Sequence, residues 1–386
     1  MIEFIGIKRF KTLLEASFPL STLNIFSGLN GMGKSSVIQT LLLLRQSQER
    51  MLLIRKGLLL NGDYVELGTG QDAMSIYSTD ENIEILIKWQ EAEQAEHFKF
   101  DYQPDSDLLP LSDLQSFETD DFETKVAQIL PRSLLFASLS LFNRNFHYLS
   151  AERLGPKSHH AHSDFHIRDL NALGNHGEYT VHFIAAHGSQ ELSLATLKHE
   201  KALSNTLLEN IEAWMSEITP GLRIKATAMP EYNTATLSYA FVQGSDVTAY
   251  FKPQNVGFGL SYVLPVVTCI LSAKPGDLLI IENPESHLHP AGQAVIGRLC
   301  ALAAASDTVQ IIVESHSDHF LNGIRVAVKE SLISKNLVKL FFLQRSATGF
   351  NHESEVLSPN IDDQGRIDQW PDGFFDEWDK QLDILL

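Results

Sequence analysis

Four residues near the N-terminus have the types and the spacing of a phosphate-binding loop. Gly28, Gly33, Lys34 and Ser35 match the pattern G-x-x-x-x-G-K-S within the segment GLNGMGKSS. Glycines let backbone N–H groups close around phosphate oxygens, and the N-terminus of a following helix adds the positive end of its dipole. The pattern predicts a nucleoside triphosphate site, with the Lys34 ammonium on the β- and γ-phosphates and the Ser35 hydroxyl on Mg²⁺. The residues predicted to bind the nucleotide from this loop are Gly28, Asn30, Gly31, Gly33, Lys34, Ser35 and Ser36.

A second group that could do chemistry is the carboxylate of Glu282. It follows the apolar run LLII at 278–281, which is typical of a buried strand. A phosphate-loop fold needs a second acid of this kind to hold Mg²⁺, usually through water. We therefore interpret Glu282 as a metal ligand, and an ordinary acid at a strand end is the alternative.

The hydrophobic pattern predicts the elements that position these groups. Residues 23–26 are apolar and predict a buried strand before the phosphate loop. Residues 34–50 follow the loop and predict a helix that is apolar on almost every face, and therefore buried between layers. Strand, loop and helix in this order favour a true phosphate site over an incidental glycine-rich turn.

From residue 251 onward, helix and strand patterns alternate. The predicted strands lie at 277–282, 309–315 and 338–344, and the predicted helices at 259–273, 291–305 and 318–333. Such alternation implies right-handed parallel crossovers and a sheet covered on both faces. The carboxyl ends of adjacent parallel strands meet at one edge, so Lys34 and Glu282 can be neighbours despite their separation in sequence.

The remaining segments predict smaller elements. Residues 1–27 predict two strands around a turn, Ile2–Phe10 and Leu23–Phe26. Residues 57–147 are turn-rich and contain short alternating runs, which predict antiparallel strands at MSIYS, IEILIKW and HFKFDY. The acidic stretch 104–125 predicts a surface loop or short helix, and residues 157–250 predict a helix at 203–218 with two strands after it.

Composition and charge limit the function. The chain has 30 Lys and Arg against 48 Asp and Glu, a net charge of −18, so a general affinity for nucleic acid is not expected. No apolar run approaches a membrane span, and the N-terminus lacks the core of a signal peptide. Cys269 and Cys300 lie in apolar surroundings and suggest buried thiols in a reducing compartment, hence a cytoplasmic location.

Several segments resemble the motifs of known ATPases. The phosphate loop, the opening IEFIGIKRFKTL, and the segments IIENPESHLHP and IIVESHSDHFL are similar to motifs of ABC- and SMC-like P-loop ATPases of the OLD (overcoming lysogenisation defect) type. NVGFGLSYVLP stands where such proteins have the ABC signature loop. The closing GRIDQWPDGFFDEW resembles the C-terminal end of bacterial ATPases that carry a domain of unknown function. The likeness follows motif order along the whole chain.

The resemblance implies roles for individual residues. Gly259 and Ser261 correspond to the signature loop, which binds the γ-phosphate of ATP held by a partner subunit, so ATP would bridge a homodimer head to tail. The residue pattern alone predicts a helix start here, with Pro265 in or near its first turn; a plain helix cap is the alternative. His316 corresponds to the switch histidine beside the γ-phosphate. An ordinary structural histidine is the alternative. The segment YLSAER has the place of the Q-loop without its Gln, and leaves open whether Glu152 or Arg153 contacts Mg²⁺ or phosphate.

Asn283 departs from the related pattern. Related ATPases place a second acid directly after the metal-binding acid, where it polarises the attacking water. An Asn can position water but cannot accept its proton, although an amide suffices for slow hydrolysis in GTPases. Glu285 is the best candidate for a replacement base and His316 the next, and we expect slow turnover and a long-lived ATP-bound dimer.

Together, pattern and resemblance predict an α/β fold of the P-loop NTPase type. It comprises an ABC-type head with a mainly parallel sheet flanked by helices, an antiparallel β lobe and a small α/β insertion. The predicted head covers residues 1–345, with the lobe at 57–147 and the insertion at 157–250, and a C-terminal cap covers 346–386. The His-rich segment HHAHSDFH is interpreted as a polar loop rather than a Zn²⁺ site, since no cysteine assists it.

The favoured function is that of an Mg²⁺·ATP-dependent switch. By resemblance, it would act on a separate protein effector, a nuclease or toxin, in bacterial defence against phage. The alternative is an SMC- or RecF-like repair ATPase that clamps duplex DNA. That alternative needs a basic groove, and the Lys and Arg residues of the chain form no dense cluster in the sequence. A small-molecule kinase is disfavoured because the signature-like and switch-like motifs would have no task.

Overall fold

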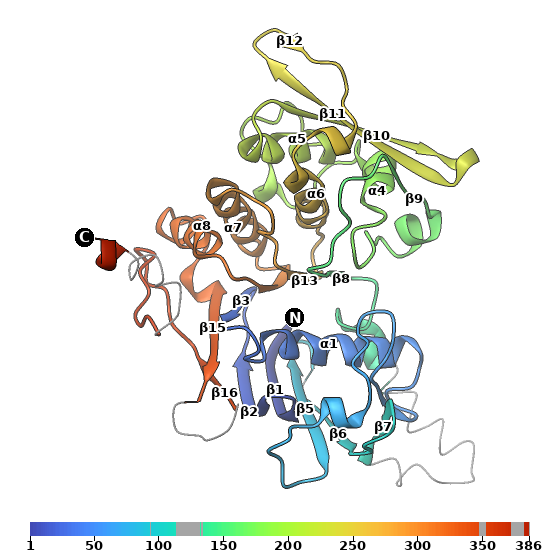
Figure 1. Ribbon diagram of the computed structural model, residues 1–386, viewed down its shortest axis with the longest axis vertical. Coiled ribbons are helices and arrows are strands. Elements are labelled where there is room, and N and C mark those ends of the chain that lie inside the picture. The colour runs from blue at the N-terminus through green and yellow to red at the C-terminus, as the bar shows by residue number, and fades with distance from the viewer. Residues whose placement is uncertain (93, 113–131, 133, 347–352, 372–381, 386) are drawn as a thin grey trace. The chain divides into compact units, whose positions relative to one another are not determined.

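The computed structural model describes residues 1–386 except 93, 113–131, 133, 347–352, 372–381 and 386 (Figure 1). The chain folds into two compact units. Unit 1 comprises Met1–Phe146, Lys339–Asn360 and Gln369–Leu386, and unit 2 comprises His147–Val338 and Ile361–Asp368.

Unit 1 contains an antiparallel sheet with one apolar face. Its strand order is β2 (Leu13–Pro19), β1 (Ile2–Phe10), β5 (Asn82–Trp89) and β6 (Glu96–Asp101). Alternate residues of β5 are fully buried: Ile83, Ile85, Ile87 and Trp89. This period of two is what a sheet with one covered face requires, because successive side chains point to opposite faces. The predicted strands IEILIKW and HFKFDY are confirmed.

The strand that leads into the phosphate loop lies in a second sheet segment of unit 1. There, β3 (Leu23–Gly28) pairs with β15 (Val338–Arg345), which pairs in turn with β16 (Ser354–Leu357). Helix α1 (Lys34–Glu49) follows the loop and buries Val37, Ile38 and Leu41–Leu44. The helix predicted at 34–50 is thus confirmed, and so is its burial. The shorter elements of unit 1 are β4 (Gly57–Leu59), β7 (Leu108–Pro110) and α2 (Gly70–Ala73).

In unit 1 the sequence interpretation was wrong at two places. Residues 11–22 are more than a turn, because β2 follows β1 through a tight turn in which Lys11 has a left-handed backbone, with φ 52°. MSIYS is no strand: Met74 makes an isolated bridge to Phe10, and turns follow it. Of the acidic stretch 104–125, residues 113–125 lie outside the described residues.

Unit 2 contains parallel strands joined by helices. Its strand order is β14 (Gln310–Glu314), β13 (Leu278–Glu282) and β8 (Phe146–Leu149). Strands β13 and β14 are parallel, with Glu282 opposite Glu314. The connecting helices are α6 (Phe258–Leu271), α7 (Pro290–Ala304) and α8 (Asp318–Lys329). The predicted alternation of helices and strands is confirmed. Strands that are almost wholly apolar need helices on both faces of the sheet, which the connecting helices supply.

The rest of unit 2 is the α/β part predicted between 157 and 250. Its strands are β9 (His159–Ala161), β10 (Leu222–Met229), β11 (Thr234–Gln243) and β12 (Asp246–Val247), and its helices are α4 (Thr180–His187) and α5 (Leu207–Ile218), both in contact with β10 (Figure 1). Single helical turns lie at Phe165–Asp169, Ala195–Leu197, Pro230–Tyr232, Pro253–Asn255 and Lys335–Leu337. The sequence interpretation missed α4 and β9, which are short.

Two bulk predictions can be compared with the structure. Cys269 and Cys300 are buried free thiols, as predicted. Within the described ranges no helix combines the length and the apolar character needed to cross a bilayer. The boundaries of the predicted head and cap stay predictions.

Candidate functional site

The phosphate loop lies between β3 and α1 in unit 1. Gly31 and Gly33 have left-handed backbones, with φ 76° and 86°, and Gly33 is the N-cap of α1. The first turn of α1 carries no acidic residue that would offset the positive end of its dipole. Lys34 is buried, and its Nζ donates a hydrogen bond to the C=O of Leu29 at 2.8 Å. The ammonium is therefore held within the loop, while Asn30, Gly31 and Ser35 are exposed and Ser36 is buried.

Gly28 and Gly31 allow a matched test of the loop's backbone. A Cβ on Gly28, at φ 137°, would lie 2.0 Å from the C=O oxygen of Leu343, whereas a Cβ on Gly31 meets nothing within 4 Å. We expect Gly28→Ala to lower the free energy of unfolding by about 3 kcal/mol, because clash adds to strain. Gly31→Ala should lower the free energy of unfolding by about 1 kcal/mol, from backbone strain alone. Urea unfolding of both variants measures the difference, and equal losses would contradict the close approach of Leu343.

In unit 2, Glu282 ends β13 with both carboxylate oxygens engaged. The Tyr148 hydroxyl donates to its Oε1 at 3.0 Å, and the Ala151 N–H donates to its Oε2 at 3.3 Å. Burial raises the pKa of Glu282 above its ordinary value, although these two hydrogen bonds oppose the rise. A carboxylate held in place and poorly solvated suits a cation, since the cation would supply the missing charge compensation. The residues present therefore fit the predicted Mg²⁺ role of Glu282.

The structure gives a backbone reason for the amide at position 283. Asn283 has φ 44°, in the left-handed region that Asn tolerates better than most residues. Its N–H donates to the C=O of Glu314 at 2.8 Å, which fixes the turn after β13. Its side-chain Oδ1 is buried and accepts no hydrogen bond from the described residues. The side-chain oxygen of Asn283 is therefore an unused acceptor beside Glu282. No pattern in the sequence predicted the left-handed backbone of Asn283.

The two candidate bases differ in their surroundings. Glu285 is 6% exposed, and its Oε1 accepts a hydrogen bond from the backbone N–H of His316 at 2.9 Å. Burial raises the pKa of the Glu285 carboxyl. The His316 side chain is 41% exposed, and its Nε2 lies 3.8 Å from Oε1 of Glu314. The structure thus brings Glu282, Asn283, Glu285 and His316 together within unit 2, and the role of each stays a prediction.

The signature-like segment begins α6, as predicted. Gly257 is the N-cap, and Phe258 is exposed at the tip of the helix. A Cβ on Gly259 would lie 2.4 Å from the C=O oxygen of His287, so glycine permits the close contact between α6 and the loop after β13. Ser261 is buried one turn further in. Pro265 lies in the interior of α6 and not in its first turn, so the expectation for Pro265 was wrong.

A cavity of about 510 Å³ adjoins the signature-like segment in unit 2. Its lining includes Gly257 and Gly259 from that segment, and His287 and His289 from the loop after β13. The two histidines thus share one surface with the helix tip.

Most of the chain matches a known protein family. A family described as "AAA domain, putative AbiEii toxin, Type IV TA system" matches residues 23–322, which include the phosphate loop, Glu282 and His316. The chain belongs to this family. Residues 333–385 of this AAA protein also match a family described as "Protein of unknown function (DUF3696)". No curated protein matches the chain.

Solved structures of SMC heads resemble this AAA protein in fold. An SMC head bound to the C-winged helix domain of ScpA covers 93% of this chain and 98% of its own, with a TM-score of 0.50 and 13% identity. The SMC head domain from Thermotoga maritima covers 94% and 99%, with a TM-score of 0.45 and 11% identity. An SMC head with an extended coiled coil, bound to the C-terminal domain of ScpA derived from Pyrococcus furiosus, covers 100% and 98%, with a TM-score of 0.49 and 14% identity.

The predicted fold class is confirmed by the first of these structures together with the family match. The AAA protein has the P-loop NTPase fold of an SMC- or ABC-type head, with a mixed sheet that contains parallel strands and is flanked by helices. Its family is one of AAA domains, and its fold is that of an SMC head. Its relation to OLD-family ATPases stays a prediction.

Glu152 and Arg153, at the Q-loop position of the AAA protein, have different surroundings. Glu152 is exposed, whereas Arg153 is 4% exposed and directs its guanidinium at backbone carbonyls of unit 2. Those N–H groups are already used and are not presented to a phosphate. The local sequence gives no sign of these contacts, because three of the four carbonyls that Arg153 binds lie more than 100 residues away. Whether Glu152 or Arg153 contacts Mg²⁺ or phosphate stays a prediction.

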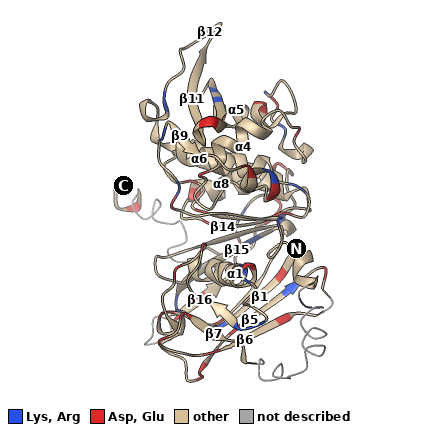
Figure 2. Ribbon diagram, turned by 90° about the vertical axis from the view of Figure 1, so that its right-hand side faces the viewer, with Lys and Arg blue, Asp and Glu red and all other residues tan. Residues whose placement is uncertain are grey.

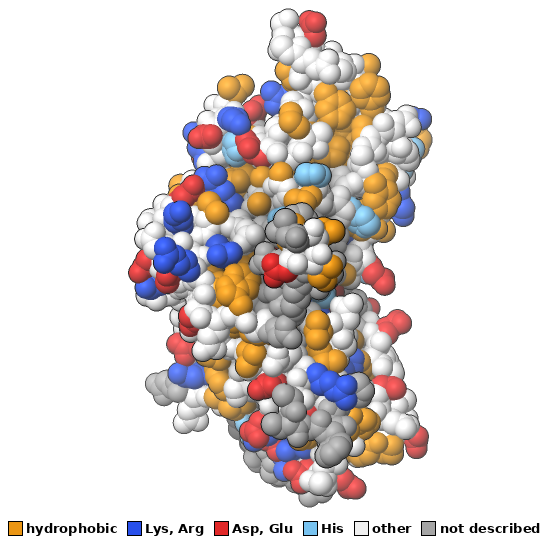
Figure 3. Space-filling view, turned by 60° about the vertical axis from the view of Figure 1, so that its left-hand side comes forward, with side chains coloured by type: hydrophobic (Ala, Val, Ile, Leu, Met, Phe, Trp, Pro, Cys, Tyr) orange, Lys and Arg blue, Asp and Glu red, His pale blue; other side chains and the backbone are white. Residues whose placement is uncertain are grey.

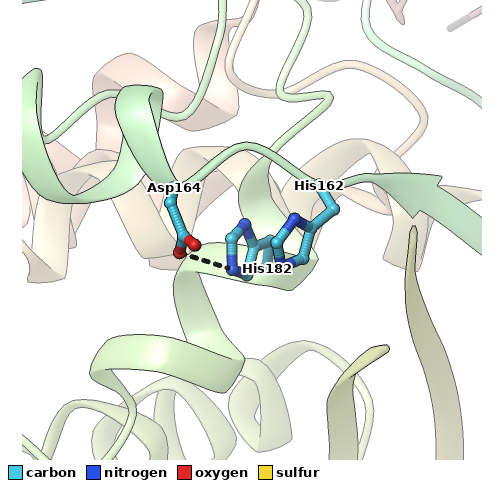
Figure 4. A group of neighbouring side chains, drawn as sticks. All are labelled: His162, Asp164 and His182. Carbon is cyan, nitrogen blue, oxygen red and sulfur yellow. Dashed lines mark ion pairs between the residues drawn. The ribbon is translucent and has the colours of Figure 1, made fainter. Parts of the chain in front are cut away.

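Among the described residues of the AAA protein, His162, Asp164 and His182 form a group with the composition of a metal site (Figure 4). The His162 and His182 rings stack with centroids 3.8 Å apart and planes 20° apart, so no single ion can lie in both ring planes. The Ser163 N–H donates to Nδ1 of His182, which leaves the proton of a neutral imidazole on Nε2, facing Asp164 at 3.8 Å. Burial lowers the pKa of His182 and favours this neutral form. The geometry supports the interpretation of a polar cluster without a metal ion.

The described surface of the AAA protein mixes charges of both signs. Figure 2 shows Lys and Arg interspersed along the ribbon with Asp and Glu. Figure 3 shows the same mixture together with exposed apolar groups toward the end that carries β12, where Val247, Tyr250 and Phe251 are exposed.

Proposed function

We propose that the AAA protein is a slow, ATP-dependent switch that works with a separate protein effector. ATP joins two copies head to tail, with the phosphates in the loop of one copy and Gly259 and Ser261 of its partner at the γ-phosphate. The joined state controls an effector of the nuclease or toxin kind. The family description, which names a putative AbiEii toxin of a Type IV toxin–antitoxin system, supports a setting in bacterial defence.

The observation that carries the proposal is the pairing of a complete phosphate loop with an incomplete hydrolytic turn. Lys34 is held within the loop by the Leu29 carbonyl, and Glu282 is held by Tyr148 and Ala151. In this proposal Lys34 binds phosphate and Glu282 binds Mg²⁺, but Asn283 cannot take a proton from water. Mg²⁺, when bound, neutralises phosphate charge and polarises the phosphoryl oxygens. Tight binding with slow turnover is what a switch requires.

Ser261 must become more accessible before its hydroxyl can meet a γ-phosphate. Ser261 is 7% exposed in the single chain and lines a small cavity together with Leu237 and Pro265. Gly257 and Phe258 are the exposed residues of the same helix tip. We therefore propose that the backbone N–H groups of the tip meet the γ-phosphate first, and that the Ser261 hydroxyl joins them only if the tip shifts on dimer formation.

Light scattering of the purified protein tests the switch. We expect the mass to double with ATP and Mg²⁺ and to stay that of a monomer with ADP, because only the γ-phosphate reaches the partner. Lys34→Ala should remain monomeric in every condition. Lys88→Ala removes an exposed lysine of unit 1 that pairs with Glu3 at 2.9 Å, and should behave as the intact protein does. The same mass for the intact protein with ATP, with ADP and with no nucleotide would refute the proposal.

A further inference from the structure

Arg153 connects three segments of unit 2 that are far apart in sequence. Its Nε donates to the C=O of Tyr262 on α6 at 3.1 Å. Its two terminal nitrogens donate to the carbonyls of Ser150 at 2.9 Å, Glu282 at 2.7 Å and Asn283 at 2.5 Å. One side chain thus binds the loop after β8, the signature-like helix and the turn after β13.

Two of the four carbonyls that Arg153 binds belong to Glu282 and Asn283, the residues of the predicted hydrolytic turn. Glu282 is the predicted Mg²⁺ ligand, and Asn283 has the left-handed backbone at the position of the missing base. A left-handed residue after a strand is costly unless its surroundings fix it. Arg153 binds the carbonyl of Glu282, and Glu314 binds the N–H of Asn283, so both ends of the peptide between Glu282 and Asn283 are held. Arg153 also binds the next carbonyl, that of Asn283.

The local charges permit a buried guanidinium here. Burial lowers the pKa of Arg153 to about 10, and the nearby carboxylates of Glu285 and Glu282 oppose that change. The group therefore stays protonated at neutral pH. A planar guanidinium carries five N–H donors in a fixed fork, whereas a lysine ammonium is a single point on a flexible chain and cannot serve three segments at once.

We infer that Arg153 is a positioning residue that couples the signature-like helix to the Glu282–Asn283 turn. It fixes where the Glu282 carboxylate and the Asn283 amide stand relative to the tip of α6. A movement of α6 on meeting a partner subunit is passed directly to the turn, because both are bound to one rigid side chain. This inference rests on the proposed function for its catalytic meaning, but the positioning itself can be tested without nucleotide.

Hydrogen exchange on Arg153→Lys, without nucleotide, tests the positioning. The substitution keeps the charge beside Glu285 and Glu282 but loses the fork. We expect exchange in peptides covering residues 282–288 to become about tenfold faster or more, since opening of that turn is no longer opposed. Peptides from β10 and β11 should be unchanged. Arg223→Lys is the matched control in the same unit, where a half-exposed arginine pairs with Glu212 at 3.0 Å, and should leave residues 282–288 protected. Unchanged exchange in Arg153→Lys would overturn the inference.

Kinetics of the same variants test the catalytic meaning. We expect kcat for ATP to fall about tenfold or more in Arg153→Lys, with KM within about threefold of the intact protein, because the phosphate loop is untouched. In Arg153→Ala, added guanidinium ion should restore part of kcat. Fast exchange with an unchanged kcat would overturn the coupling to hydrolysis. An intact protein that neither binds nor hydrolyses ATP would refute the proposed function, while the exchange experiment would still judge the positioning.

Discussion

Glu282→Gln is expected to lower the steady-state rate of ATP hydrolysis about 100-fold or more, because the Mg²⁺ ion that would polarise the phosphate loses its anionic ligand. Gln has nearly the same shape as Glu, and its side-chain oxygen can still accept the hydrogen bond from the Tyr148 hydroxyl or the Ala151 N–H. The change therefore removes charge more than structure. The nucleotide should still bind at the phosphate loop, but Mg²⁺ should no longer raise its affinity.

Two measurements separate this effect from unfolding. Burial raises the pKa of Glu282, which means that the fold disfavours its charged form. A neutral side chain should therefore leave the free energy of unfolding unchanged or higher at neutral pH. Thermal unfolding checks this, and fluorescent-nucleotide binding with and without Mg²⁺ checks the metal dependence. Glu217→Gln, at a half-exposed residue that pairs with Lys201, is the matched control and should keep the full rate. A rate for Glu282→Gln within threefold of the intact protein would rule out the metal role.

Asn283→Glu is expected to raise the rate of ATP hydrolysis by about 10- to 100-fold, because a general base contributes roughly 10²–10⁴-fold where it is well placed. The expected gain is below the full contribution for a structural reason. Position 283 has φ 44°, and a residue other than Asn or Gly loses about 1 kcal/mol or more in that conformation. The new carboxylate will also lie beside Glu282, and like charges raise the free energy of the charged pair.

Asn283→Gln is the control for the backbone cost. It carries the same left-handed strain and a longer side chain, but it supplies no base, so its rate should not rise above that of the intact protein. Both variants should unfold at a lower temperature than the intact protein. Single-turnover kinetics with ATP and Mg²⁺ measure the rates, and light scattering follows the lifetime of the dimer, which should shorten in Asn283→Glu. If the intact protein turns over many ATP molecules per second, and Asn283→Glu does not change that rate, Asn283 is not the limiting residue.

The two predictions together distinguish a slow switch from an inactive nucleotide binder. A slow switch loses its remaining activity in Glu282→Gln and gains activity in Asn283→Glu. A protein that only holds ATP has no rate to lose, and its dimer persists in all variants. Neither prediction tests the effector, because the proposal does not place Glu282 or Asn283 in contact with it.

Much of the local structure could be predicted from the sequence. The helix at 34–50, the strands that end at Phe26 and Glu282, and the alternation of helices and strands after residue 251 depend on apolar periodicity within short windows. Strand β2 was missed because the turn between β1 and β2 is very short, so no loop-like segment separates the two strands in the sequence. The MSIYS segment has the alternation of a strand but lacks a partner strand, and alternation alone cannot supply one.

The sequence by itself determined the phosphate loop, since its glycine spacing and the flanking strand and helix are contiguous and their geometry follows from local backbone rules. Only the tertiary structure decided how the hydrolytic turn is built. The turn at Asn283 and the buried carboxylate of Glu285 depend on hydrogen bonds with Glu314 and His316 of the next strand and loop. Three of the four carbonyls bound by Arg153 lie more than 100 residues away in the chain. Hydrogen bonds of that kind are set by packing, and no pattern of neighbouring residues records them.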